Sequence, residues 1–131
     1  AHIADYTTVQ KNIDGRSLVG LLEGNSDNTW NARSLVWHIP NKWTTPDGPG
    51  INFFSAIRQG DFKLVYNMKQ AKLELYNLAE DIGETNDIAG KNKKKVKELS
   101  DILSEKLKTW DAQLPSYKLN GKQVPYPNQL N

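Results

Sequence analysis

Apolar and polar residues alternate with a period of two through the middle of the chain, which is the pattern of a β-strand. In the first such segment, Leu35, Trp37 and Ile39 occupy every second position. Similar segments follow at residues 52–58, 62–67 and 72–78 ("NFFSAIR", "FKLVYN" and "KLELYNL"). Short polar turns separate the last three segments, so the sequence predicts an antiparallel meander of about four strands.

The segment at residues 40–50 interrupts this pattern. It reads "PNKWTTPDGPG" and contains three prolines and two glycines. Proline lacks the backbone N–H that a strand interior uses, and glycine favours turns. The composition therefore predicts that Pro40 ends the first strand and that a loop follows it.

A period of three to four residues replaces the period of two near the C-terminus. The apolar positions that recur at this spacing are Val96, Leu99, Ile102, Leu103, Leu107, Trp110 and Leu114. This stripe predicts an amphipathic helix of about four to five turns, which we expect Pro115 to stop. A helix whose apolar stripe covers one face of an antiparallel sheet is an α+β fold.

The patterns divide the chain into three parts. Residues 1–31 hold one short apolar patch between turn formers and are predicted to be an arm. Residues 32–114 contain the predicted sheet and helix. Residues 115–131 form a tail in which Asn120 and Gly121 favour a tight hairpin turn.

Composition and charge narrow the classes of protein further. The chain has 131 residues, enough for one domain, and a net charge of +2 is too balanced to indicate nucleic-acid binding. The absence of cysteine excludes disulfides and thiolate metal sites. No apolar run approaches the roughly 18 residues of a membrane span. The lysine run at residues 91–97 is more typical of a solvated face than of a polyanion site.

Four carboxylates lie close together after the last predicted strand, at Glu80, Asp81, Glu84 and Asp87. Their spacing does not match a calcium loop, which needs oxygen ligands at regular offsets around a glycine. Acidic side chains in such a connection commonly accept backbone N–H bonds. We therefore expect these residues to shape a turn and predict no metal site.

A cluster of aromatic and basic residues at the exit of the first strand is a candidate binding site. The segment "WHIPNKW", residues 37–43, holds two tryptophans, His38 and Lys42. Aromatic faces and cations suit a sugar ring with an anionic group. The simpler alternatives are a packed or hydrogen-bonded histidine and a core role for Trp37. No nucleophile–base pair accompanies the cluster.

Four segments, in order, resemble the C-terminal region of the type I, formylglycine-dependent sulfatases. They are "IDGRSLVGLLEGN" at 13–25, "RSLVWHIPN" at 33–41, "SAIRQGDFKLVYN" at 55–67 and "LELYNLAEDIGETNDIA" at 73–89. The end of the predicted helix, "LKTW" at 107–110, resembles a further family motif. The resemblance implies hydrolysis of sulfate monoesters, expected on carbohydrates, in the periplasm or outside the cell.

The same resemblance implies that the catalytic centre lies elsewhere. The family oxidises the first residue of C/S-x-P-x-R to formylglycine, and this chain has no cysteine and no serine in that motif. We expect no catalytic residue here, and the chain by itself to be inactive. Formylglycine and calcium would belong to a preceding catalytic domain, the main partner of this chain. The resemblance also implies that the arm at residues 1–31 is the end of that domain. His38, Asn41, Lys42 and Trp43 are the predicted contacts to the sulfated carbohydrate.

Two other interpretations remain open. The chain could be a non-catalytic module that binds sulfated glycans through Lys42, Lys63 and the lysine run. It could also be a structural domain without a ligand. Salt-sensitive binding to heparin-like polymers distinguishes the first alternative.

Overall fold

The computed structural model describes residues 15, 18–24, 32–45 and 48–130, with only the backbone for 43–45 and 48–51. Its elements, in chain order, are α1 (Val19–Leu22), β1 (Ser34–Thr45), β2 (Gly48–Gln59), β3 (Phe62–Asn67), β4 (Lys72–Asn77), the 3-10 turn η2 (Ala89–Lys91), α3 (Lys93–Thr109) and the 3-10 turn η3 (Pro127–Leu130).

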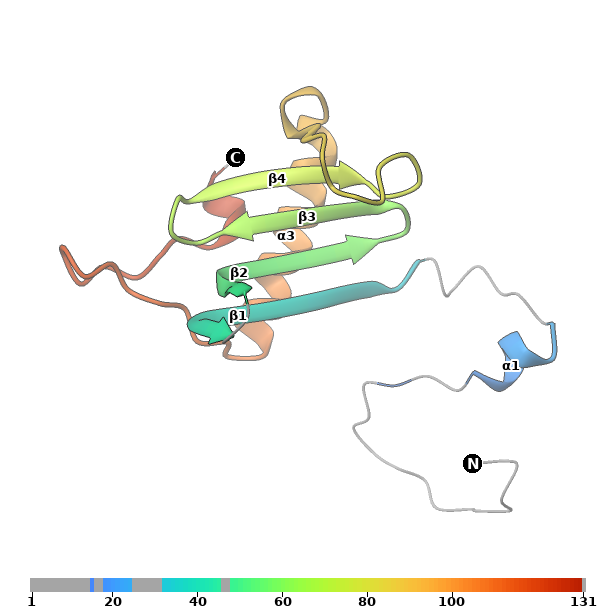
Figure 1. Ribbon diagram of the computed structural model, residues 1–131, viewed down its shortest axis with the longest axis horizontal. Helices are drawn as coiled ribbons and strands as arrows, with labels where there is room; N and C mark the ends of the chain where they lie inside the picture. The colour runs from blue at the N-terminus through green and yellow to red at the C-terminus, as the bar shows by residue number, and fades with distance from the viewer. Residues whose placement is uncertain (1–14, 16–17, 25–31, 46–47, 131) are drawn as a thin grey trace, which may run out of the picture.

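The four strands form one antiparallel sheet in the order β1-β2-β3-β4, and helix α3 crosses one face of it (Figure 1). The predicted α+β fold is therefore confirmed. Short turns between β2 and β3 and between β3 and β4 fix the register, with Ile57 opposite Leu64 and Leu64 opposite Leu75. Because side chains alternate between faces, this register places these three residues on the helix side.

The core lies between the sheet and α3. Ile57, Leu64 and Leu75 from the sheet are fully buried, as are Leu99, Leu103 and Leu107 from the helix. Tyr66 joins them and donates a hydrogen bond from its hydroxyl to the carbonyl of Pro125 at 2.7 Å. Burial raises the pKa of Tyr66 to about 12, so the hydroxyl keeps its proton.

The predicted loop at residues 40–50 is wrong. Strand β1 continues through Pro40 to Thr45, and β2 begins at Gly48, so most of the segment is an extension of the hairpin. The register shifts between Ile39 and Lys42, which marks a β-bulge. Because β1 is an edge strand, Pro40 removes no hydrogen bond to a second neighbour, and the bulge accommodates it.

The predicted end of the helix is also wrong. Helix α3 ends at Thr109, five residues before Leu114, and Asp111 adopts a left-handed conformation with φ 49°. A left-handed residue just past the last turn is a common helix terminator, so Pro115 is not needed to stop it. Trp110 consequently leaves the apolar stripe and is 56% exposed.

Residues 115–130 pack against the rest of the described chain. Val124 and Pro127 are buried, and the Val124 N–H donates to the carbonyl of Pro115. Gly121 has φ 67°, as expected for the Asn-Gly turn, and a single bridge joins Ser116 to Gln123. The division at residue 115 stays a prediction. The arm at 1–31 lies mostly outside the described residues.

Within the described ranges, no helix combines the length and apolar character needed to cross a bilayer.

Candidate functional site

The acid-rich loop holds itself together through Asp81. Its carboxylate accepts hydrogen bonds from the backbone N–H groups of Thr85 and Asn86, both at 2.8 Å, and from the Thr85 hydroxyl at 3.0 Å. These hydrogen bonds hold the pKa of Asp81 below its ordinary value, and the bond from the Asn86 N–H has the largest effect. The carboxylate therefore works as the acceptor that closes this turn.

The neighbouring acids also have partners within the chain. One oxygen of Asp87 accepts from the N–H of Leu75 at 3.1 Å and of Ala89 at 2.9 Å, which ties β4 to η2. Glu84 forms a salt bridge with Lys63 at 2.5 Å. Among the described residues, no three histidine or acidic side chains are grouped as a metal site would require. The geometry agrees with the turn-shaping role predicted for this loop.

His38 lies on the helix side of the sheet, between β2 and the segment after α3. Its Nδ1 is 2.7 Å from the hydroxyl oxygen of Ser55, and its Nε2 is 2.8 Å from the carbonyl oxygen of Gln113. Ser55 pairs with His38 across the strands and is 1% exposed. His38 therefore connects β1 to the chain that follows the helix.

These partners fix the tautomer of the neutral ring. A carbonyl oxygen only accepts, so Nε2 must carry the hydrogen that it donates to Gln113. Nδ1 then has a lone pair and accepts from the Ser55 hydroxyl. Because both nitrogens have a partner, direct contact with a ligand would require one of these bonds to open.

The other predicted site residues lie further along the hairpin. Asn41 is exposed within the bulge, and Lys42 is exposed opposite Asn52. The backbone of Trp43 pairs with Ile51, whereas its side chain lies outside the described part of the structure. The side-chain oxygen of Asn52 is buried and has no hydrogen-bond partner among the described residues. The bulge thus separates His38 from Asn41 and Lys42.

The sequence interpretation missed a groove at the exposed edge of β1. Its volume is about 730 Å³, and its lining residues are Arg33, Ser34, Leu35, Val36, Trp37, Lys106 and Trp110. Trp37 is 47% exposed rather than in the core. The amine of Lys106 lies 5.6 Å from the centre of the Trp110 ring. The exposure of Trp110 depends on where α3 ends. Periodicity alone placed Trp110 in the apolar stripe and did not indicate that its side chain is exposed.

Comparison with known proteins supports the resemblance in sequence. No protein-family model matches the chain. A curated protein from Formosa agariphila, named a sulfatase, is 27% identical over 123 residues, which cover 89% of this chain and 22% of that protein. The chain is related to sulfatases. It spans about a fifth of the length of this relative, and the match is consistent with a sulfatase C-terminal region.

Two solved structures share the arrangement of strands and helix. The first is a protein in complex with its substrate D-glucosamine-2-N,6-O-disulfate. It matches with a TM-score of 0.60 and 28% identity, over 79% of this chain and 21% of its own. The second is a candidate sulfatase from Bacteroides thetaiotaomicron, with a TM-score of 0.57 and 17% identity, over 92% of this chain and 27% of its own. The second likeness concerns the fold alone.

Proposed function

We propose that this chain is the C-terminal region of a sulfatase that hydrolyses sulfate monoesters on carbohydrates. The observation that carries the proposal is the match to a sulfatase over 89% of the chain. The four ordered sequence segments point to the same family. The disulfated glucosamine bound by one structural neighbour supports a sulfated sugar as the substrate class. The family relationship also motivates a periplasmic or extracellular location.

In this proposal, the hydrolytic centre belongs to a preceding catalytic domain. The chain contains neither a cysteine nor a serine in C/S-x-P-x-R from which formylglycine could form. Its match accounts for 22% of the related sulfatase, which leaves room for such a domain. When bound there, calcium and formylglycine would supply the charge stabilisation and the nucleophile for attack on sulfur.

The role that we propose for this chain is to support the catalytic domain and to form one side of the substrate cleft. The exposed groove with Trp37 and Trp110 offers a surface on which a larger partner could pack. The hairpin formed by β1 and β2 offers Asn41, Lys42 and Trp43 as substrate contacts. His38 would act beside them by fixing β1 against Ser55 and Gln113.

The first test is the sequence of the gene upstream of the codon for Ala1. We expect an open reading frame, in phase, that encodes C/S-x-P-x-R several hundred residues earlier. The full-length protein should then release sulfate from a sulfated glucosamine, and the 131-residue chain should not. A stop codon in phase directly upstream of a start codon at this position would contradict the proposal.

The second test concerns the hairpin residues in that full-length enzyme. Lys42→Ala should raise KM about tenfold, because it removes a cation that faces the anionic sugar. His38→Ala should lower kcat/KM by about tenfold or more. Lys94→Ala, an exposed lysine on α3, is the matched control and should leave both constants unchanged. Kinetics of Lys42→Ala that equal those of the control would remove Lys42 from the site.

The second candidate function, a non-catalytic module for sulfated glycans, is favoured by the groove at β1. It combines two exposed tryptophans with Arg33 and Lys106, the residue types that stack on sugars and attract sulfate. This function would be supported if the isolated chain is retained on heparin at low salt and released at high salt, and if Trp37→Ala abolishes the retention. Retention that is unchanged in that variant would exclude the groove.

A further inference from the structure

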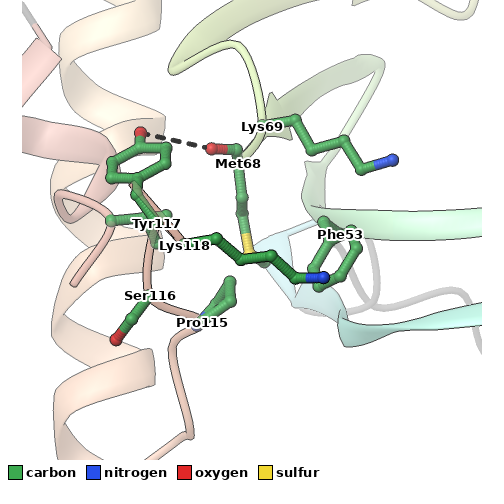
Figure 2. Close-up of a pocket in the computed structure, with 8 residues that line it drawn as sticks. Phe53, Met68, Lys69, Pro115, Ser116, Tyr117 and Lys118 are labelled. Carbon is green, nitrogen blue, oxygen red and sulfur yellow. Dashed lines mark hydrogen bonds between the residues drawn. The ribbon is translucent and has the colours of Figure 1, made fainter. Parts of the chain in front are cut away.

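A second cleft lies on the helix side of the sheet, between the hairpin and the C-terminal segment (Figure 2). It has a volume of about 250 Å³ and is lined by Phe53, Met68, Lys69, Pro115, Ser116, Tyr117, Lys118 and Val124. The sequence segments that form it are far apart, at residues 53, 68–69 and 115–124. None of them belongs to the groove at the edge of β1.

The wall contributed by β2 has an unusual backbone. Phe53 has φ 55°, a left-handed conformation that bulky residues rarely adopt. It lies opposite Pro40 and Asn41, because the register moves from Ile39–Phe54 to Lys42–Asn52. Bulges of this kind redirect side chains and are frequent beside functional sites, where local strain is retained.

Two further segments hold this wall in place. The carbonyl of Phe53 accepts a hydrogen bond from the N–H of Met68 at 3.0 Å. The hydroxyl of Tyr117 donates to the carbonyl of Met68 at 3.4 Å, the dashed line in Figure 2. The tail is itself closed by the bond from the Tyr117 N–H to the Lys122 carbonyl. The cleft is therefore formed by the native fold and not by a single exposed loop.

The cleft combines aromatic surface with positive charge. The amine of Lys69 lies 5.2 Å from the centre of the Phe53 ring, and Lys118 extends along the cleft from the opposite wall (Figure 2). None of the described lining residues carries a carboxylate. Across residues 32–45 and 48–130, neither amine forms an ion pair. Such a lining is complementary to an anionic ligand with an apolar face.

Size limits that ligand to one ring. Pockets for drug-sized molecules commonly span roughly 300–1,000 Å³, and this cleft is smaller. A pyranose ring presents an apolar face to aromatic residues, and an acidic substituent on it would lie within reach of the lysines. The wall residue Phe53 directly follows Asn52, the partner of Lys42 in the hairpin. The cleft thus adjoins the predicted substrate contacts.

We propose that this cleft is a subsite for one sugar ring that carries an acidic substituent. It would bind the sugar unit next to the sulfated sugar that contacts the hairpin. In this respect the inference rests on the proposed function. Phe53 and Tyr117 provide the apolar walls, and Lys69 and Lys118 provide the charge. The acidic group is a sulfate or a carboxylate, since both are anions that a lysine amine binds as a point charge.

The chain offers a direct probe of this cleft, because Met68 is its only methionine. We would label the methionine methyl group of the 131-residue chain with carbon-13 and titrate D-glucose 6-sulfate, following the single methyl resonance by NMR. A saturable shift with a dissociation constant of roughly 1–10 mM is expected for one ring. D-glucose and methyl sulfate, which supply the ring and the anion separately, should each give much weaker binding.

Lys118→Gln should weaken binding about fivefold, the effect of one exposed charge pair. The matched control is Lys122→Gln, an exposed lysine of the same tail outside the cleft, which should bind as the parent chain does. D-glucuronate should bind in the same range, because a carboxylate satisfies the same lysines. Lys118 is exposed, so the variant should keep the fold and the undisturbed Met68 resonance.

Three results would overturn the subsite. They are an unmoved Met68 resonance, equal shifts with D-glucose and D-glucose 6-sulfate, and equal affinities of the two lysine variants. The outcome is independent of the proposed enzyme. Sulfate release by the full-length protein with an unmoved Met68 would reject only the subsite. A specific Met68 response without an upstream catalytic domain would reject only the sulfatase assignment.

Discussion

Replacement of His38 by alanine tests whether this residue stabilises the domain. The variant removes two hydrogen bonds, one from Ser55 at 2.7 Å and one to the carbonyl of Gln113 at 2.8 Å. Gln113 is exposed, so water can replace the second bond, at a cost of about 0.5–1.5 kcal/mol. Ser55 is 1% exposed and would leave a buried hydroxyl without this partner, at a further cost of about 1–3 kcal/mol.

We therefore expect His38→Ala to lower the free energy of unfolding by about 1.5–4.5 kcal/mol. The assay is urea denaturation of the 131-residue chain, followed by circular dichroism and by tryptophan fluorescence to check that unfolding is two-state. Ser55→Ala should cost less, about 1 kcal/mol, because the freed Nδ1 of a half-buried ring can find water. The double variant should show a coupling energy of about 1 kcal/mol.

The control is Asn41→Ala, an exposed residue of the same strand, which should change stability by less than about 0.5 kcal/mol. A loss in His38→Ala that is as small as in this control would refute the structural role, as would an absence of coupling with Ser55. Nitrogen-15 NMR of the imidazole gives an independent check. The neutral ring should carry its hydrogen on Nε2, and the opposite tautomer would contradict the hydrogen-bond assignment.

Three further changes have definite expected outcomes. Ala71→Gly should raise the unfolding free energy by about 0.5–1 kcal/mol, because Ala71 has φ 48° in the turn between β3 and β4; urea denaturation showing a loss would contradict this. Leu103→Ala should lower it by about 2–5 kcal/mol, since Leu103 is fully buried under the sheet, and a loss below about 1 kcal/mol would mean that the core is loosely packed. Asp81→Asn should be less stable than the parent chain at neutral pH. The folded-state pKa of Asp81 lies below its ordinary value of 3.8, so its contribution is present above that value and is lost as the pH falls through the folded pKa. The two stability curves should converge in acid, and a difference that persists there would contradict the charge-based explanation.

Periodicity was a reliable guide where one side of an element faces the core. The alternation in β3 and β4 and the stripe from Val96 to Leu107 predicted the sheet, the helix and the faces that meet between them. These patterns reflect burial directly, since a residue on the wrong face would expose apolar surface. The relationship to sulfatases was likewise visible in the sequence, because four characteristic segments follow one another in the same order.

The same rules were wrong at the hairpin, because composition does not show which strand lies at an edge. Pro40 and the glycines indicated a loop, yet an edge strand tolerates proline, and β1 pairs with β2 as far as Thr45. The end of α3 was misplaced for a similar reason. Asp111 is left-handed where the chain leaves the helix toward Gln113, the long-range partner of His38, and Trp110 is 56% exposed there.

The sequence by itself determined the α+β class, the meander, the apolar helix face and the kinship with sulfatases, because each is encoded by local periodicity or by ordered motifs. Only the tertiary structure decided which side chains meet across long separations. His38 contacts Gln113 over 75 positions, and Phe53 shares a cleft with Lys118. Such contacts depend on register, on the bulge and on the path of the tail, and these are set by packing of the whole domain rather than by any one segment.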